Sequence, residues 1–188
     1  MRKELRHIFS RLWHLVLEAP ETWDLIAKEE TDERQLRRQY TFIPIALSAL
    51  LVFLGTWAIV DFQHAIATMC RDIIALLTAY YTICQLCRIV INRQFPQRYN
   101  LEDSDKVVGY CYTVIIIIQT IVSIIPNSVY LYLLDFFVAY LLWEAAQAVF
   151  ALKDEEQQIF VLYFTAIIIA VPLIYIALLN FIVLKNIF

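Results

Sequence analysis

The sequence predicts an all-α polytopic membrane protein with five transmembrane helices, preceded by cytoplasmic amphipathic helices. Hydrophobic residues make up 61% of the 188 residues and charged residues only 18%, which is too apolar for a water-soluble fold of this size. The apolar residues form long runs with little charge, as helices surrounded by lipid require. We therefore expect a cytoplasmic helical segment at residues 1–39 and a membrane domain at residues 40–188.

Residues 1–17 have the pattern of a basic amphipathic helix. Apolar residues recur every three or four positions, and the basic residues fall mostly on the other face. Such a helix lies in the headgroup layer of an anionic leaflet, packs on its own protein, or binds a partner by the helix-in-groove mode. The residues expected to contact the membrane surface or a partner are Leu5, Phe9, Trp13, Trp23, Arg37 and Arg38.

A second short helix is predicted to begin at Pro20, because proline suits the first turn of a helix. Trp23 and Ile26 are expected to form its buried edge. The polar stretch that follows ends in a basic and aromatic border, typical of a helix that begins to cross a bilayer: Arg37, Arg38 and Tyr40.

Five apolar segments predict the membrane-crossing helices. Each has about the 20 residues that cross 30 Å of hydrocarbon at 1.5 Å per residue. The predicted spans are residues 40–60, 73–91, 107–125, 129–152 and 159–184. The apolar run from 107 to 152 is about twice the length of one span, so we expect a helical hairpin that turns at Pro126, Asn127 and Ser128.

The connections between spans are less uniform in composition. Residues 61–72 indicate a short connection, although a longer helix that starts near Ala65 and includes Arg71 is an alternative. Residues 92–106 are polar and predict a loop. Pro172 lies near the middle of the fifth span and predicts a kink, because proline removes a backbone hydrogen bond and crowds the preceding turn.

The distribution of lysine and arginine predicts the orientation. The N-terminal segment, the loop after the second span and the loop that carries Lys153 all fall on one side, which the positive-inside rule assigns to the cytoplasm. The other side receives only Arg71 and Lys185. An odd number of spans then places the C-terminus outside, and we expect a multi-pass protein of the cell inner (cytoplasmic) membrane.

Polar side chains at membrane depth are candidate sites, because a charge in hydrocarbon is costly. By helix rise, Glu144 and Arg88 lie at similar depths and can pair. Asp135 lies nearer the far surface, with Gln119 at a similar depth and Arg71 close by, so a hydrogen-bonded cluster is expected there. These groups either form an ion pathway or a headgroup pocket, or they bond one another and fix the helix register. The sequence favours the second, structural role.

Neither a metal site nor a catalytic motif is predicted. Cys84 and Cys87 have the CxxC spacing, but no second cluster supplies the further ligands that a metal needs. The sequence contains no P-loop, GxSxG or HExxH motif. We therefore expect no enzymatic activity, no cofactor and no nucleic-acid partner.

Several short patterns occur in a characteristic order. Residues 19–29 read APETWDLIAKE, the first span contains Pro44 and Gly55, residues 109–113 (GYCYT) open the third span, and residues 129–133 (VYLYL) open the fourth. In this order the chain resembles the Yip family (Ypt-interacting proteins), in its short bacterial form. The resemblance implies five spans and a cytoplasmic N-terminal region. The chain lacks the Asp-Leu-Tyr-Gly-Pro motif of eukaryotic members, which are associated with Rab-type GTPases, so no GTPase contact and no active-site residue is carried over.

Two functional hypotheses follow from these features. The first is a non-enzymatic membrane-organising protein with a trafficking-like or adaptor role, whose N-terminal helices contact lipid or a cytoplasmic protein. The second is a small transporter or channel that uses Asp135, Glu144 and Arg88. A homo-oligomer is also expected, because five short spans can hardly shield two buried carboxylates alone.

Overall fold

The computed structural model describes residues 2–29, 32–95, 101–125 and 129–187, and every regular element in these ranges is a helix. Within these ranges, five helices are long and apolar enough to cross a membrane. They are Arg34–Ile59, Phe62–Gln94, Glu102–Ile124, Tyr130–Ala148 and Asp154–Ile182. The predicted all-α polytopic fold with five transmembrane helices is therefore confirmed.

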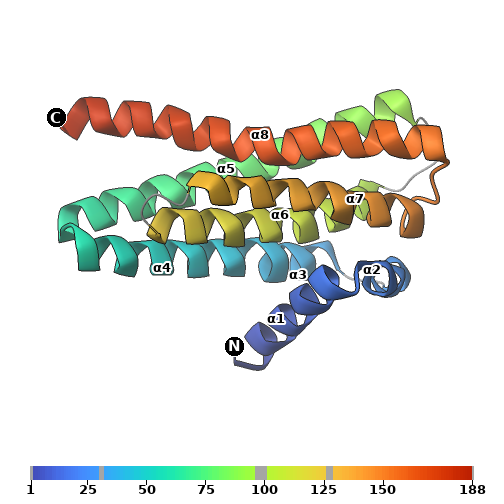
Figure 1. Cartoon of the computed structure of the whole chain (residues 1–188), viewed down its shortest axis with the longest axis horizontal. Coiled ribbons are helices and arrows are strands. Elements are labelled where there is room, and N and C mark those ends of the chain that lie inside the picture. The colour runs from blue at the N-terminus through green and yellow to red at the C-terminus, as the bar shows by residue number, and fades with distance from the viewer. Residues whose placement is uncertain (1, 30–31, 96–100, 126–128, 188) are drawn as a thin grey trace.

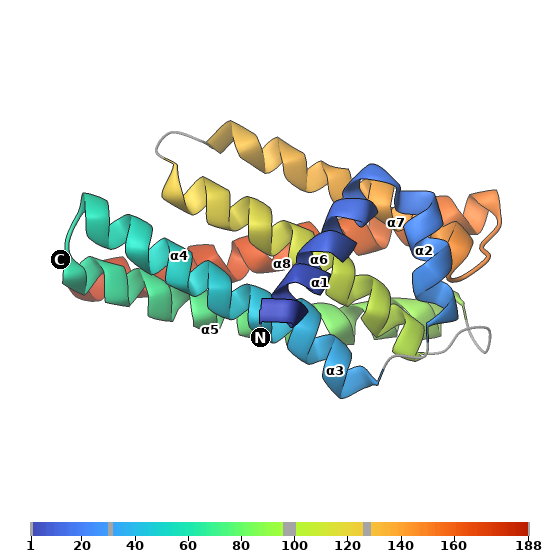
Figure 2. The same ribbon diagram turned by 90° about the horizontal axis from the view of Figure 1, so that it is seen from below.

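The N-terminal region forms the two helices that the sequence predicts. They are α1 (Arg2–Leu17) and α2 (Ala19–Lys28), and Pro20 lies in the first turn of α2. Trp23 and Ile26 are buried, as expected. Figure 1 shows α1 leaving the bundle at an angle, and Figure 2 shows it crossing the face formed by α4 and α6.

The first span begins earlier than predicted. α3 (Glu33–Arg37), η1 (Arg38–Phe42) and α4 (Ile43–Ile59) follow one another without a break, so the helix extends into the polar residues before position 40. η1 is a π-helix, in which each N–H bonds the carbonyl five residues back. Pro44 lies just after this π-turn and has no backbone N–H to donate to the preceding turn.

The predicted connection at residues 61–72 is wrong, and the alternative of a longer helix is close to the structure. α5 (Phe62–Gln94) begins directly after Asp61, whose carboxylate accepts from the His64 N–H at 2.8 Å. This hydrogen bond is the main cause that holds the pKa of Asp61 below its usual value. Arg71 donates to the neighbouring Asp72 at 2.8 Å, so two charged residues are satisfied inside the helix.

The predicted loop at residues 92–106 is also wrong at both ends. α5 continues to Gln94, and α6 (Leu101–Ile124) begins before the charged run ends. Glu102 and Asp103 lie in the first turn of α6, where acidic residues interact favourably with the helix dipole. A charged run at this position therefore marks the start of a helix.

The fourth and fifth spans complete the bundle. η2 (Val129–Phe136) is a 3₁₀-helix that leads into α7 (Phe137–Ala148). Residues 126–128, predicted as the hairpin turn, lie outside the described residues. α8 (Asp154–Ile187) runs through Pro172 as one helix. α6 is the central helix and packs against α3, η1, α4, α5, η2, α7 and α8.

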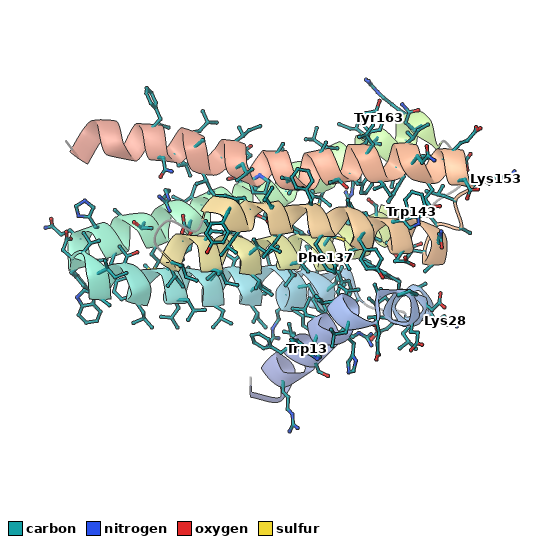
Figure 3. The ribbon with its side chains drawn as sticks, in the orientation of Figure 1. Trp13, Lys28, Phe137, Trp143, Lys153 and Tyr163 are labelled. Atoms are coloured by element: carbon teal, nitrogen blue, oxygen red, sulfur yellow. The ribbon has the colours of Figure 1, made fainter. Side chains whose placement is uncertain are left out.

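The connections fall at two ends of the bundle. Figure 1 places α2 and the start of α8 at one end, and the C-terminus and the turn between α4 and α5 at the other. Lys28 of the N-terminal segment and Lys153 of the last connection, which are predicted to share one side of the membrane, thus lie at the same end (Figure 3).

Candidate functional site

Residues 109–113 of α6 form the junction between the N-terminal helices and the bundle. The Tyr110 ring lies edge-on to Trp23 of α2, with ring centroids 5.8 Å apart, and 4.1 Å from the Tyr40 ring of η1. The Tyr112 hydroxyl donates to the Leu76 carbonyl of α5 at 2.8 Å. One short motif therefore fixes α2, η1 and α5 around the central helix.

The π-turn at η1 is joined to the same motif. Its wider turn displaces backbone carbonyls from the regular α-helical pattern. The Tyr40 carbonyl accepts from the buried Thr113 hydroxyl at 2.5 Å. Because a buried carbonyl needs a partner, Thr113 allows the irregular turn to persist inside the protein.

Glu29 ties α1, α2 and α6 together at the end of α2. Its carboxylate pairs with Arg11 of α1, and its backbone carbonyl accepts from the Lys106 ammonium at 3.0 Å. A cation at this position also interacts favourably with the negative end of the α2 dipole. The N-terminal helices are therefore held by charge as well as by aromatic packing.

α1 has two apolar stripes rather than one. The first, Ile8, Leu12 and Leu15, is buried against the protein. The second, which we call the outer stripe, consists of Phe9, Trp13 and Leu17, which are 54%, 65% and 62% exposed. Figure 3 shows Trp13 on the part of α1 that stands away from the spanning helices. The amphipathic helix thus packs on its own protein and presents apolar surface outward.

The other residues predicted to contact the membrane surface or a partner lie in different surroundings. Trp23 is buried inside the junction, and Arg38 is exposed near Arg34 at the start of the first span. Arg37 lines a small cavity that it shares with Arg88. Leu5 belongs to α1, but its side chain lies outside the described part of the chain.

Arg88 binds a carboxylate that the sequence analysis had placed in a loop. Its Nε donates to Asp105 of α6 at 3.2 Å, and a second guanidinium nitrogen completes a two-bond contact with the same carboxylate. The suggested pairing with Glu144 is therefore replaced by one with Asp105. Glu144 lies on α7, which packs mainly on α2, α6, α8 and η2 rather than on α5.

The hydrogen-bonded cluster predicted around Asp135 does not form as expected. Arg71 instead donates to Asp72 and, at 2.5 Å, to Asn180 of α8. Asp135 is 1% exposed and Gln119 is 4% exposed. Within the described part of the chain, neither side chain has a hydrogen-bond partner. Two buried polar groups therefore stay unsatisfied in the half of the bundle that contains the α6–η2 hairpin.

Three of the four cysteines lie in the protein core. Cys84, Cys87 and Cys111 are buried, and burial raises the cost of the thiolate that a metal requires. In the ranges that the structure describes, no three His, Cys, Asp or Glu side chains are grouped as a metal would require. These cysteines pack as small apolar residues of the core.

The comparisons with known proteins identify the family. The Yip1 domain family model matches residues 14–183. The chain belongs to the Yip family. No curated protein and no solved structure gave a match. Yip proteins are generally non-enzymatic membrane proteins, and the resemblance first suggested by short motifs is confirmed.

The matched region of this Yip protein includes the whole junction but begins within α1. Sequence reasoning found the motif at residues 109–113 but missed what it contacts. It also missed Asp105, an acidic residue of the charged run at 102–106. The contacts that form the site join different helices, so they cannot be identified before the packing of α6 is known.

Proposed function

We propose that the chain is a membrane-organising protein of the Yip type, without enzymatic activity, in the inner membrane of the cell. Its N-terminal helices lie in the cytoplasm and its C-terminus lies outside. The orientation follows from the lysine and arginine residues collected at one end of the bundle. The observation that carries the proposal is the outer stripe of Phe9, Trp13 and Leu17.

The outer stripe would act by entering one leaflet only. A basic amphipathic helix buries its apolar face at the boundary between headgroups and acyl chains, while its charges stay among the headgroups. In this chain, the helix is fixed to the spans by the buried stripe and by the Arg11–Glu29 ion pair. Inserted volume would therefore accumulate in the cytoplasmic leaflet wherever the protein gathers, and would bend the membrane.

The experiment compares the full chain with a variant in which Trp13 and Leu17 are replaced by serine. Both proteins are reconstituted at equal density in vesicles that contain phosphatidylglycerol, and vesicle diameters are measured by electron cryomicroscopy. We expect the wild type to shift the population to smaller diameters, and the variant to lose most of this shift. The matched control is Leu25→Ser, an exposed leucine on α2. Equal diameters for the wild type and the variant would contradict the proposal.

A deletion separates the N-terminal helices from the spans. Removing residues 1–38 shortens the helix of the first span, Arg34–Ile59, at its polar start. The spans should still insert, because the apolar run of the first span begins at Tyr40. Lipid organisation, and any adaptor role in which the outer stripe docks in a groove of a cytoplasmic protein, should be lost. A deletion variant that bends vesicles as the wild type does would place the function in the spans.

Asp135 supports a second candidate, a small transporter or channel. A carboxylate buried at membrane depth without a partner is costly, and such residues often mark ion or proton pathways. Arg88 and Glu144 are not brought to this position, so the candidate now depends on Asp135 and Gln119. Proton flux into liposomes that falls in Asp135→Asn would support it. Flux equal to that of protein-free liposomes would exclude it.

A further inference from the structure

A groove lies between α1, α4 and α6, and α1 leaves the bundle at an angle beside it (Figure 1). Three helices line it: Ile8 and Phe9 come from α1, Leu47 and Leu51 from α4, and Ile117 and Ile121 from α6. Its volume is about 150 Å³. Phe9, Leu51 and Ile121 are each more than two-fifths exposed, so the groove is open to the surroundings of the protein.

The hydroxyl groups in the groove are already satisfied by the protein. Ser48 and Thr120 share a hydrogen bond of 2.5 Å, and Thr120 also donates to the Ile116 carbonyl at 2.6 Å. Thr113 bonds the Tyr40 carbonyl. A water molecule needs two or more polar partners to occupy a cavity, whereas an apolar cavity of about this volume stays dry and accepts apolar guests. The groove therefore favours an apolar occupant.

The size and position of the groove restrict that occupant. A volume of about 150 Å³ suits a narrow apolar group better than a helix, which is about 10 Å across with its side chains. An alkyl chain is narrow enough. The outer face of α4 continues beyond the groove as exposed Leu50, Leu54 and Trp57, so a chain that starts in the groove stays on apolar surface along its length.

The charge beside the groove indicates the headgroup. α1 carries four basic residues, Arg2, Lys3, Arg6 and Arg11, and one acidic residue, Glu4. By contrast, α2 carries Glu21 and Asp24 against Lys28. The basic charge is thus concentrated on the helix that forms one wall of the groove, and a basic segment at the membrane surface attracts anionic lipid.

We infer that the groove between α1, α4 and α6 binds one acyl chain of an anionic phospholipid, whose headgroup lies near the basic residues of α1. The inference rests on the proposed function only in placing α1 among the headgroups. The acyl chain fills the space between α1 and α4. Packing contacts that the tilted α1 cannot make with α4 are then made through the lipid.

The test uses the full wild-type chain in vesicles that contain phosphatidylglycerol with a photoreactive acyl chain. After illumination, the labelled peptides are identified by mass spectrometry. We expect labelling concentrated on residues 8–12, 43–51 and 113–121. Phosphatidylcholine with the same photoreactive chain should label these peptides about fivefold less, as expected for about one basic side chain near the headgroup. Labelling spread evenly over the lipid-facing helices, or equal labelling by the two lipids, would overturn the inference.

A matched pair of variants tests the groove itself. Leu47→Trp places a larger ring in the groove and should remove most of the labelling at residues 8–12. Leu50→Trp is the control, because Leu50 is exposed on the same helix and does not line the groove. Equal labelling in both variants would overturn the inference. Neither variant alters Trp13 or Leu17. The test of acyl-chain binding in the groove is therefore independent of the test of membrane bending by the outer stripe.

Discussion

Replacing Trp23 by alanine is expected to lower the free energy of opening of α2 by about 3–5 kcal/mol, the usual cost of truncating a buried tryptophan. Trp23 is fully buried and packs edge-on against Tyr110 of α6. We have proposed that this end of the bundle faces the cytoplasm, where the hydrophobic effect would contribute to the stability of the junction. The loss should release α1 and α2 while the spans stay folded.

Amide hydrogen exchange over residues 19–28 measures this opening free energy directly. Leu25→Ala is the matched control, because Leu25 lies on the same helix and is 59% exposed. Substitutions of exposed residues usually change the free energy of unfolding by about 0.5 kcal/mol or less. If both variants exchange at the same rate as the wild type, the aromatic junction does not hold the N-terminal helices.

The number of spans was predictable because hydropathy reports directly on contact with lipid. Residues 107–152 show this: the run has only two charged residues, Asp135 and Glu144, and is about twice the length of one span, so it has to fold back. Helix ends were less predictable. Residues 62–72 and 101–106 are polar enough to lie outside hydrocarbon, but polar residues form helices readily, and α5 and α6 continue through them.

The partners of the polar residues were not predictable from depth alone. Arg88 and Glu144 lie at similar depths, but depth does not say which helices are neighbours. α5 packs on α4, α6 and α8, so its arginine meets a carboxylate of α6. Asp105 lies in a charged stretch outside the predicted spans, so depth within the spans does not identify it as a partner.

The motif at residues 109–113 shows a further limit. Its order in the chain was enough to suggest the family, but its hydrogen bonds to Tyr40 and Leu76 join residues 73 and 36 positions apart. Such contacts depend on the crossing of packed helices. Amphipathicity predicted one apolar face for α1, and the structure divides that face into a buried stripe and an outer stripe.

Replacing Asp105 by asparagine should destabilise the bundle by about 1.5–3 kcal/mol, the range for hydrogen bonds that involve a charged group. Asparagine has nearly the same volume as aspartate, but it lacks the charge and the second acceptor oxygen that the Arg88 guanidinium uses. The Asp105 side chain is 5% exposed and that of Arg88 32% exposed. Partial solvation of Arg88 keeps the expected loss below the 3–5 kcal/mol of a fully buried pair.

Thermal unfolding of the full chain in detergent checks this prediction, with a dye that reacts with Cys84, Cys87 and Cys111 once they are uncovered. Asp103→Asn is the control, since Asp103 lies on the same helix and its contact with Lys106 is longer, at 3.4 Å, and partly exposed. Ion pairs of that kind contribute about 0–1 kcal/mol. Asp135→Asn should have the opposite sign, because it removes a buried charge that has no partner in the described structure. Equal unfolding temperatures for the Asp103 and Asp105 variants would show that the Arg88 pair does not stabilise the contact between α5 and α6.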